Sequence, residues 1–86
     1  MRTIVCLDLG KERIYLKSIF PVDWSYYISD ARGYLSEEDA KIQLNSRYYK
    51  IAERLDGNQN LINNIKLLTY EGDTLISKNY YLSREE

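Results

Sequence analysis

The chain opens with two apolar stretches that have the pattern of paired β-strands. Residues 3–9 are apolar on both alternations, which is typical of a central strand that is covered on both faces. After a break at Gly10, residues 13–20 place one set of apolar side chains, which ends with Phe20, on a single face. Two such stretches joined by a short turn that contains glycine predict an antiparallel hairpin, which Pro21 ends.

Alternation of side chains between two faces, with a period of two residues, recurs in three later stretches. Residues 24–29 alternate aromatic or aliphatic with polar positions and predict a third, short strand. Residues 65–70 and 74–82 predict a second hairpin around an acidic, glycine-containing turn. Residues 58–64 are rich in asparagine, which is disfavoured inside a helix, so we interpret them as a loop and leave open a single helical turn.

Between the hairpins, a period of three to four predicts one helix from about residue 36 to about residue 55. Ser36 is a good N-cap, the three acidic residues after it favour the positive end of the helix dipole, and Gly57 is a stop signal. The apolar stripe of this helix comprises Ala40, Leu44, Tyr48, Ile51, Ala52 and Leu55. Tyr49 lies about 100° away from Tyr48 on the helix, off that stripe.

These elements predict an α+β fold in a single domain over residues 1–86, with residues 83–86 as a frayed polar tail. We expect two layers, with one long helix packed on a mostly antiparallel sheet of four or five strands. The order of the elements is similar to that of the ubiquitin-like β-grasp, in which a helix also follows a first hairpin. That resemblance implies a β-grasp topology.

The composition excludes much enzyme chemistry. The chain has no histidine, so it has no imidazole base and no histidine ligand for zinc. Cys6 is its only cysteine and stands in an apolar run, where we expect a buried and inert thiol. We therefore expect no catalytic residues, no metal site and no cofactor.

The distribution of charge bears on location and partners. Charged residues occur in the first hairpin, and no stretch reaches the roughly 18 apolar residues of a membrane span, so we expect a cytoplasmic protein without a membrane partner. The lone cysteine requires no oxidising compartment. The formal net charge of −1 disfavours nucleic acid as a partner, since sequence-independent binders carry a basic excess.

One short segment resembles a nucleotide site. Asp8-Leu9-Gly10 follows an apolar strand and precedes another, and the segment from Ile4 to Arg13 looks like the first phosphate-binding hairpin of the actin and sugar-kinase ATPase superfamily. That resemblance implies an aspartate near a metal and a glycine turn that admits phosphate. An aspartate two residues before a hairpin glycine is also ordinary turn chemistry, which we favour.

Tyrosine is the unusual feature, with nine residues in the chain. Six of them form adjacent pairs, and on a strand adjacent side chains point to opposite faces, so each pair should put a ring on the surface. Tyrosine is enriched at interfaces because it buries a large area with little loss of entropy. With two neighbouring cations, the candidate partner-binding residues are Tyr26, Tyr27, Tyr49, Tyr80, Tyr81, Arg47 and Lys50.

We therefore expect a non-enzymatic, protein-binding module that acts by occupying a partner's surface. By analogy of size and composition with small phage and mobile-element products, it could inhibit a host defence nuclease. The alternative is a nucleic-acid-binding domain that uses the tyrosines and the basic helix face. A tyrosine-covered surface without a partner is equally open, and a sheet edge could join two copies of the chain.

Overall fold

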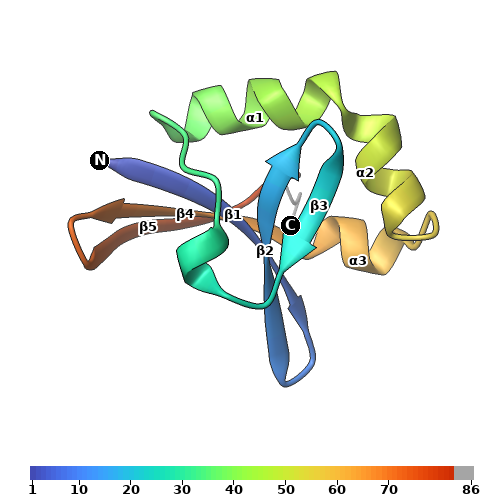
Figure 1. Ribbon diagram of the computed structural model, residues 1–86, viewed down its shortest axis with the longest axis horizontal. Helices are drawn as coiled ribbons and strands as arrows, with labels where there is room; N and C mark the ends of the chain where they lie inside the picture. The colour runs from blue at the N-terminus through green and yellow to red at the C-terminus, as the bar shows by residue number, and fades with distance from the viewer. Residues whose placement is uncertain (83–86) are drawn as a thin grey trace.

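The computed structural model describes residues 1–82, which form a five-stranded antiparallel sheet with three helices packed on one face (Figure 1). The strand order across the sheet is β3-β2-β1-β4-β5. The strands are β1 (Arg2–Leu9), β2 (Glu12–Ile19), β3 (Val22–Ser25), β4 (Ile65–Glu71) and β5 (Thr74–Tyr80). The helices are α1 (Glu37–Ser46), α2 (Tyr48–Arg54) and α3 (Gln59–Asn63), with a 3-10 turn, η1 (Ile28–Asp30). The predicted α+β class is confirmed.

The central strand is β1, as its pattern predicts. Val5 and Leu7 are fully buried in the main core beneath the helices. Ile4 and Cys6, which point to the other face, are also fully buried in a second, smaller cluster with Leu68. The strand therefore needs apolar side chains on both alternations, and the expected burial of Cys6 is confirmed.

The helical region begins where the sequence predicts, but it is not one helix. The Ser36 hydroxyl accepts a hydrogen bond from the Asp39 amide at 3.0 Å, which is the expected N-cap. At Arg47 the backbone leaves helical geometry, with φ −121° and ψ 20°, and α2 starts in a new direction. The break lets α1 pack on β1 and β4 while α2 reaches β3. The prediction of one long helix is therefore wrong, because the apolar period continues through a bend that it does not reveal.

The asparagine-rich segment contains a short helix rather than a loop alone. The Asn58 side chain accepts hydrogen bonds from the amides of Asn60 and Leu61 and so caps α3. Ile62 is buried in the main core. Asparagine here acts as a cap, which is why its low helix propensity does not prevent the turn.

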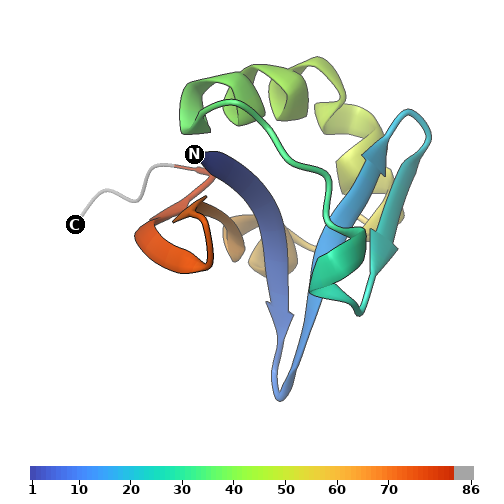
Figure 2. The same cartoon turned by 60° about the vertical axis from the view of Figure 1, so that its left-hand side comes forward.

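The predicted third strand over 24–29 is misplaced, because β3 spans Val22–Ser25 and so begins two residues earlier and ends four residues earlier. β3 ends at Ser25, whose hydroxyl donates to Asp30 at 2.6 Å and so holds η1 against the strand. The chain then crosses the sheet face that the helices leave uncovered, and Ala31 packs on the second cluster. The Arg32 amide donates to the Leu16 carbonyl, so this segment bonds to β2 where β2 separates from β1 (Figure 2). The face opposite the helices is thus partly covered.

A bulge in β2 changes the position of Phe20. The register with β3 shifts between Leu16 and Ser18, so Ile19 rather than Phe20 takes the next core position. Phe20 lies in the turn after β2 and is 76% exposed. Its predicted place on the buried face is wrong for that reason.

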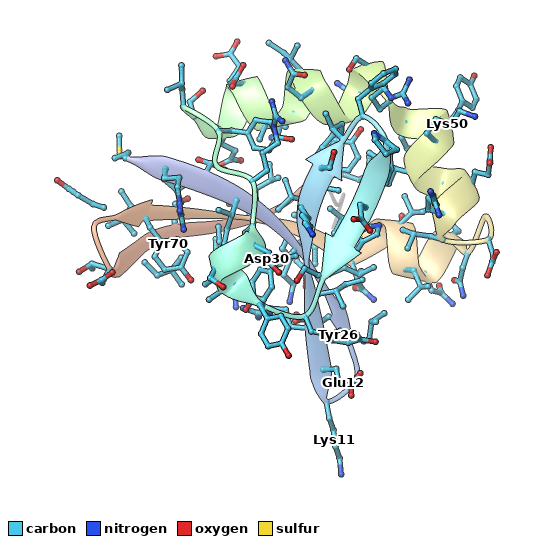
Figure 3. The ribbon with its side chains drawn as sticks, viewed as in Figure 1. Lys11, Glu12, Tyr26, Asp30, Lys50 and Tyr70 are labelled. Carbon is cyan, nitrogen blue, oxygen red and sulfur yellow. The ribbon has the colours of Figure 1, made fainter. Side chains whose placement is uncertain are left out.

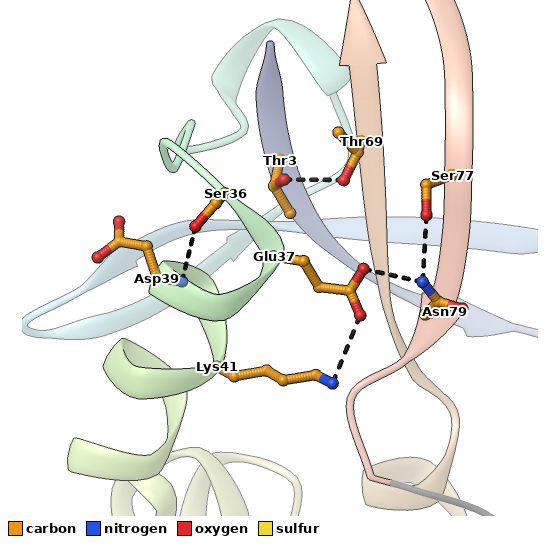
Figure 4. A network of polar contacts seen from close by, with 8 residues as sticks. All are labelled: Thr3, Ser36, Glu37, Asp39, Lys41, Thr69, Ser77 and Asn79. Atoms are coloured by element: carbon orange, nitrogen blue, oxygen red, sulfur yellow. Dashed lines mark hydrogen bonds and ion pairs between the residues drawn. The ribbon is translucent and has the colours of Figure 1, made fainter.

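The second hairpin forms as predicted, except that β5 ends at Tyr80 rather than at residue 82. Its outer strand is tied to α1, because the Asn79 side chain donates to Glu37, which also pairs with Lys41 (Figure 4). The β-grasp order is not confirmed: three strands precede the helices, and every strand pair is antiparallel. The predicted tail over 83–86 lies outside the described residues.

Candidate partner-binding surfaces

A pair of ion contacts crosses the sheet face opposite the helices. Asp8 accepts from Arg13 Nε at 2.6 Å and from Lys66 Nζ at 2.7 Å, so one carboxylate joins β2, β1 and β4. The hydrogen bonds from Arg13 and Lys66 lower the pKa of Asp8 to about 2, and the pKa of Arg13 is raised by the same contact with Asp8. Asp8 is thus engaged by two cations of its own chain.

The turn beside Asp8 has ordinary hairpin geometry. Gly10 has φ +71°, a conformation that glycine adopts without strain, and a Cβ there would meet nothing within 4 Å. The glycine is therefore required by the backbone conformation of the turn. This geometry, with the ion pairs of Asp8, supports the turn interpretation of Asp8-Leu9-Gly10.

One row of the sheet brings Tyr80 to this face. The strand registers place Tyr80, Lys66, Cys6 and Tyr15 side by side across β5, β4, β1 and β2. Lys66 Nζ lies 5.4 Å from the centre of the Tyr80 ring, a cation–π contact that fixes the ring over the strand. Burial raises the pKa of the Cys6 thiol beneath them. Tyr80 is partly exposed and accessible, whereas Cys6 is not.

Tyr26 and Tyr27 lie together at the surface, although not on a strand. They form the link from β3 to η1 and are 64% and 69% exposed. Their exposure follows from the early end of β3, so both rings of this pair are on the surface instead of one. Figure 3 shows Tyr26 below η1, away from the helix layer.

A hollow of about 240 Å³ lies against η1, the turn that follows these tyrosines, although neither of their rings lines it. It is bounded by η1 on one side and by the β4–β5 turn on the other, with Arg2, Ile28, Ser29, Tyr70, Gly72 and Asp73 as its lining. Tyr26, Tyr27, Ile28 and Tyr70, with this hollow, are called the η1 surface below. It combines exposed aromatic rings with a recess that is partly apolar and has a charge of each sign at its edge.

Tyr81 does not belong to any surface. It is 5% exposed, packs in the main core and donates its hydroxyl hydrogen bond to Asn45 of α1. Burial raises its pKa. The alternation of side chains explains the outcome, since Tyr80 points to one face and Tyr81 to the other. Tyr81 therefore leaves the set of candidate partner-binding residues.

The remaining candidates lie on the helix side of the sheet. Tyr49 is 87% exposed on α2, while Tyr48 packs against the main core, so the expected phase of this turn is confirmed. Arg47 and Lys50 line a cleft of about 270 Å³ between α2 and the β2–β3 turn. This α2 cleft is lined by Pro21, Val22, Arg47, Lys50, Glu53 and Arg54. Figure 3 shows Lys50 well separated from Tyr26.

The structure thus divides the candidate residues between two surfaces. Tyr26 and Tyr27 belong to the η1 surface and Arg47 and Lys50 to the α2 cleft, whereas Tyr49 and Tyr80 belong to neither and lie on opposite sides of the sheet. Sequence reasoning did not find the part of the cleft contributed by the β2–β3 turn. The only signal for it is Pro21 after Phe20, which marks a turn but not what packs beside it.

Comparisons of the chain with models of known protein families, with curated proteins and with solved structures find no match. Among residues 1–82, no three histidine, cysteine, aspartate or glutamate side chains are grouped so that they could hold a metal ion. None of the helices in that range combines the length and the apolar character that crossing a membrane requires.

Proposed function

We propose that this chain is a non-enzymatic protein-binding module that acts by occupying a partner's surface, and that the η1 surface makes the central contact. The observation that carries the proposal is the pair of exposed rings, Tyr26 and Tyr27, on the link to η1, which itself lines a hollow that a partner side chain can enter. Exposed aromatic residues are typical of the energetic centre of protein interfaces.

The structure around η1 supports this use. The Ser25 hydroxyl binds Asp30 and accepts from the Tyr27 amide at 3.1 Å, so the backbone that carries both rings is held by hydrogen bonds. Ala31 anchors the end of the turn on the second core cluster. A rigid platform lowers the entropy that binding must overcome, which favours affinity.

The class of partner is proposed by analogy. A small module that binds without altering its partner has the properties of an inhibitor, and our proposed partner is a host defence nuclease in the cytoplasm of a cell attacked by a phage or mobile element. The net charge of −1 weighs against nucleic acid as the partner. We keep Tyr49 and Tyr80 as secondary contacts.

Capture from the cell of origin, followed by affinity measurement with the identified protein, tests the proposal. The double variant Tyr26→Ala, Tyr27→Ala should bind that protein about 10-fold more weakly or worse, while its stability changes by less than about 1 kcal/mol. Ile42→Ala, which truncates an exposed aliphatic residue on α1, is the matched control and should bind like the parent. The mass of the partner should be unchanged after incubation.

Two results would overturn the proposal. Full affinity in the Tyr26, Tyr27 double variant would remove the η1 surface from the interface. A change in the mass of the partner would show that the chain is an enzyme. Self-association through the edge strand β5, which the sequence leaves open, is measured separately by sedimentation of the purified chain.

A further inference from the structure

The α2 cleft concentrates positive charge on a chain that is slightly acidic as a whole. Three of its lining side chains, Arg47, Lys50 and Arg54, are cationic, and Glu53 is its only acidic lining residue among those described. The formal charge of the whole chain is −1. The cleft is therefore a local positive site that the overall balance conceals.

Arg47 is held in place by the β2–β3 turn. Its Nε donates to the Ile19 carbonyl at 3.2 Å, and its guanidinium carbon lies 4.4 Å from the centre of the Phe20 ring. Arginine stacked on an aromatic ring loses little further freedom when it binds an anion. Because Arg47 also ends α1, the helix break places this guanidinium at the cleft.

The other two cations are less constrained. Lys50 Nζ is 3.7 Å from Glu53, a pair whose side chains are more than half exposed and which contributes little to stability. Arg54, in the last turn of α2, has no ion pair with any residue that the structure describes. An incoming anion can therefore bind both Lys50 and Arg54 without breaking a strong ion pair.

We propose that the α2 cleft receives a carboxylate-bearing segment of the protein partner, with Phe20 as the adjacent apolar contact; this inference rests on the proposed function. Both surfaces adjoin β3, an edge strand: the β2–β3 turn lines the cleft, and Tyr26 and Tyr27 follow the end of the strand. A partner that approaches this edge can cover both. Arginine and exposed aromatic side chains together are typical of interface centres.

The charges of the cleft favour carboxylates over a nucleic-acid backbone. Glu53 lies within the cleft and would repel a strand that carries a phosphate on every nucleotide. Beyond the cleft, a net negative chain offers no long-range attraction to a polyanion. An acidic segment of a protein needs only one or two carboxylates, which the three cations can match.

Two probes separate these ligands without the partner. One is a fluorescein-labelled peptide with two glutamates among uncharged residues, and the other is a labelled oligothymidylate with six phosphates. At low ionic strength the peptide should bind more tightly, and its amide shift changes in nuclear magnetic resonance should centre on residues 19–22 and 47–54. Peptide shifts centred elsewhere, no binding at millimolar peptide, or tighter binding of the oligothymidylate would each overturn the inference.

Variants with matched controls sharpen the test. Arg54→Glu should weaken peptide binding about fivefold or more, whereas Lys11→Glu, which changes the net charge equally at the distant β1–β2 turn, should have less than about a twofold effect. Glu53→Gln should tighten binding about two- to fivefold by removing the competing carboxylate, and Glu12→Gln should not. The inference is contradicted if Lys11→Glu weakens binding more than Arg54→Glu does, or if Glu12→Gln tightens binding more than Glu53→Gln does.

The identified partner gives the decisive comparison. Arg54→Glu should weaken its binding about fivefold or more, by the same loss of charge pairing. If the Tyr26, Tyr27 double variant loses affinity for the partner while Arg54→Glu does not, the carboxylate site fails and the proposed function stands. If Arg54→Glu alone loses affinity, the η1 surface fails instead.

Discussion

At the scale of single residues, the place of a side chain on a strand or turn decides whether it packs within the fold or is exposed to a partner. Tyr80 and Tyr81 are neighbours in sequence, yet one lies over Lys66 on the sheet and the other is buried against Asn45. Asp8 is likewise committed, because it neutralises cations from two neighbouring strands. Its contribution to folding should therefore depend on pH.

Asp8→Asn should lower the free energy of unfolding at neutral pH by about 1 kcal/mol, allowing for solvent screening at a carboxylate whose side chain is 30% exposed. Folding lowers the pKa of Asp8 from 3.8 to about 2, so the ionised carboxylate stabilises the fold above pH 4 and loses that effect as pH falls through about 2. Urea titrations from pH 7 to pH 2 measure the difference, which should shrink in acid. The control is Asp56→Asn, at a position where asparagine tolerates the positive φ of 55°. A difference that grows in acid would contradict the assigned ion pairs.

At the scale of elements, local chemistry accounts for where each segment begins better than for how it continues. The Ser36 cap, the double-sided burial of β1 and the second hairpin all follow from patterns of neighbouring residues. The break at Arg47 does not, because it is stabilised by Phe20 and the Ile19 carbonyl, which lie 27 and 28 residues earlier in the chain.

The candidate surfaces show the same limit. The exposure of Tyr49 is predicted correctly, whereas both Tyr26 and Tyr27 are exposed where the pairing predicts one ring, and Tyr81 requires knowing which face of β5 the helices cover. The α2 cleft also depends on tertiary structure, since a bulge in β2 moves Phe20 out of the core and the β2–β3 turn lines the cleft together with α2. The periodicity of the residues reveals neither which face of β5 is covered nor that β2 contains a bulge.

Ser36→Ala tests the element that the sequence defines best. Loss of the hydroxyl leaves the Asp39 amide without its acceptor, and the free energy of unfolding should fall by about 1 kcal/mol. Ser46→Ala, at the other end of α1, is the matched control: that hydroxyl donates to the Gln43 carbonyl within the helix, so its loss should cost less. Thermal melts of both variants measure the difference. Equal effects would show that the cap does not define the start of α1.

At the scale of the whole molecule, the two cores are joined through β1. The main core lies beneath the helices and the smaller one under Ala31, and β1 supplies residues to both. The strand also pairs with β2 and β4 on its two edges. Exposure of Cys6 should therefore require the sheet itself to open, which couples its reactivity to every element that stabilises the fold.

The rate at which Cys6 reacts with a thiol reagent should report global unfolding, provided that the native chain recloses faster than it reacts. Reaction should be slow in native buffer and fast in denaturant, since burial also raises the pKa of the thiol. Ser36→Ala lies in another element, yet a loss of about 1 kcal/mol should speed the reaction about fivefold, because the unfolded fraction rises by that factor. Ser46→Ala should change the rate in proportion to its smaller effect on stability. A rate that does not respond to Ser36→Ala would show instead that the segment around Ala31 lifts locally and exposes Cys6 while the helices stay in place.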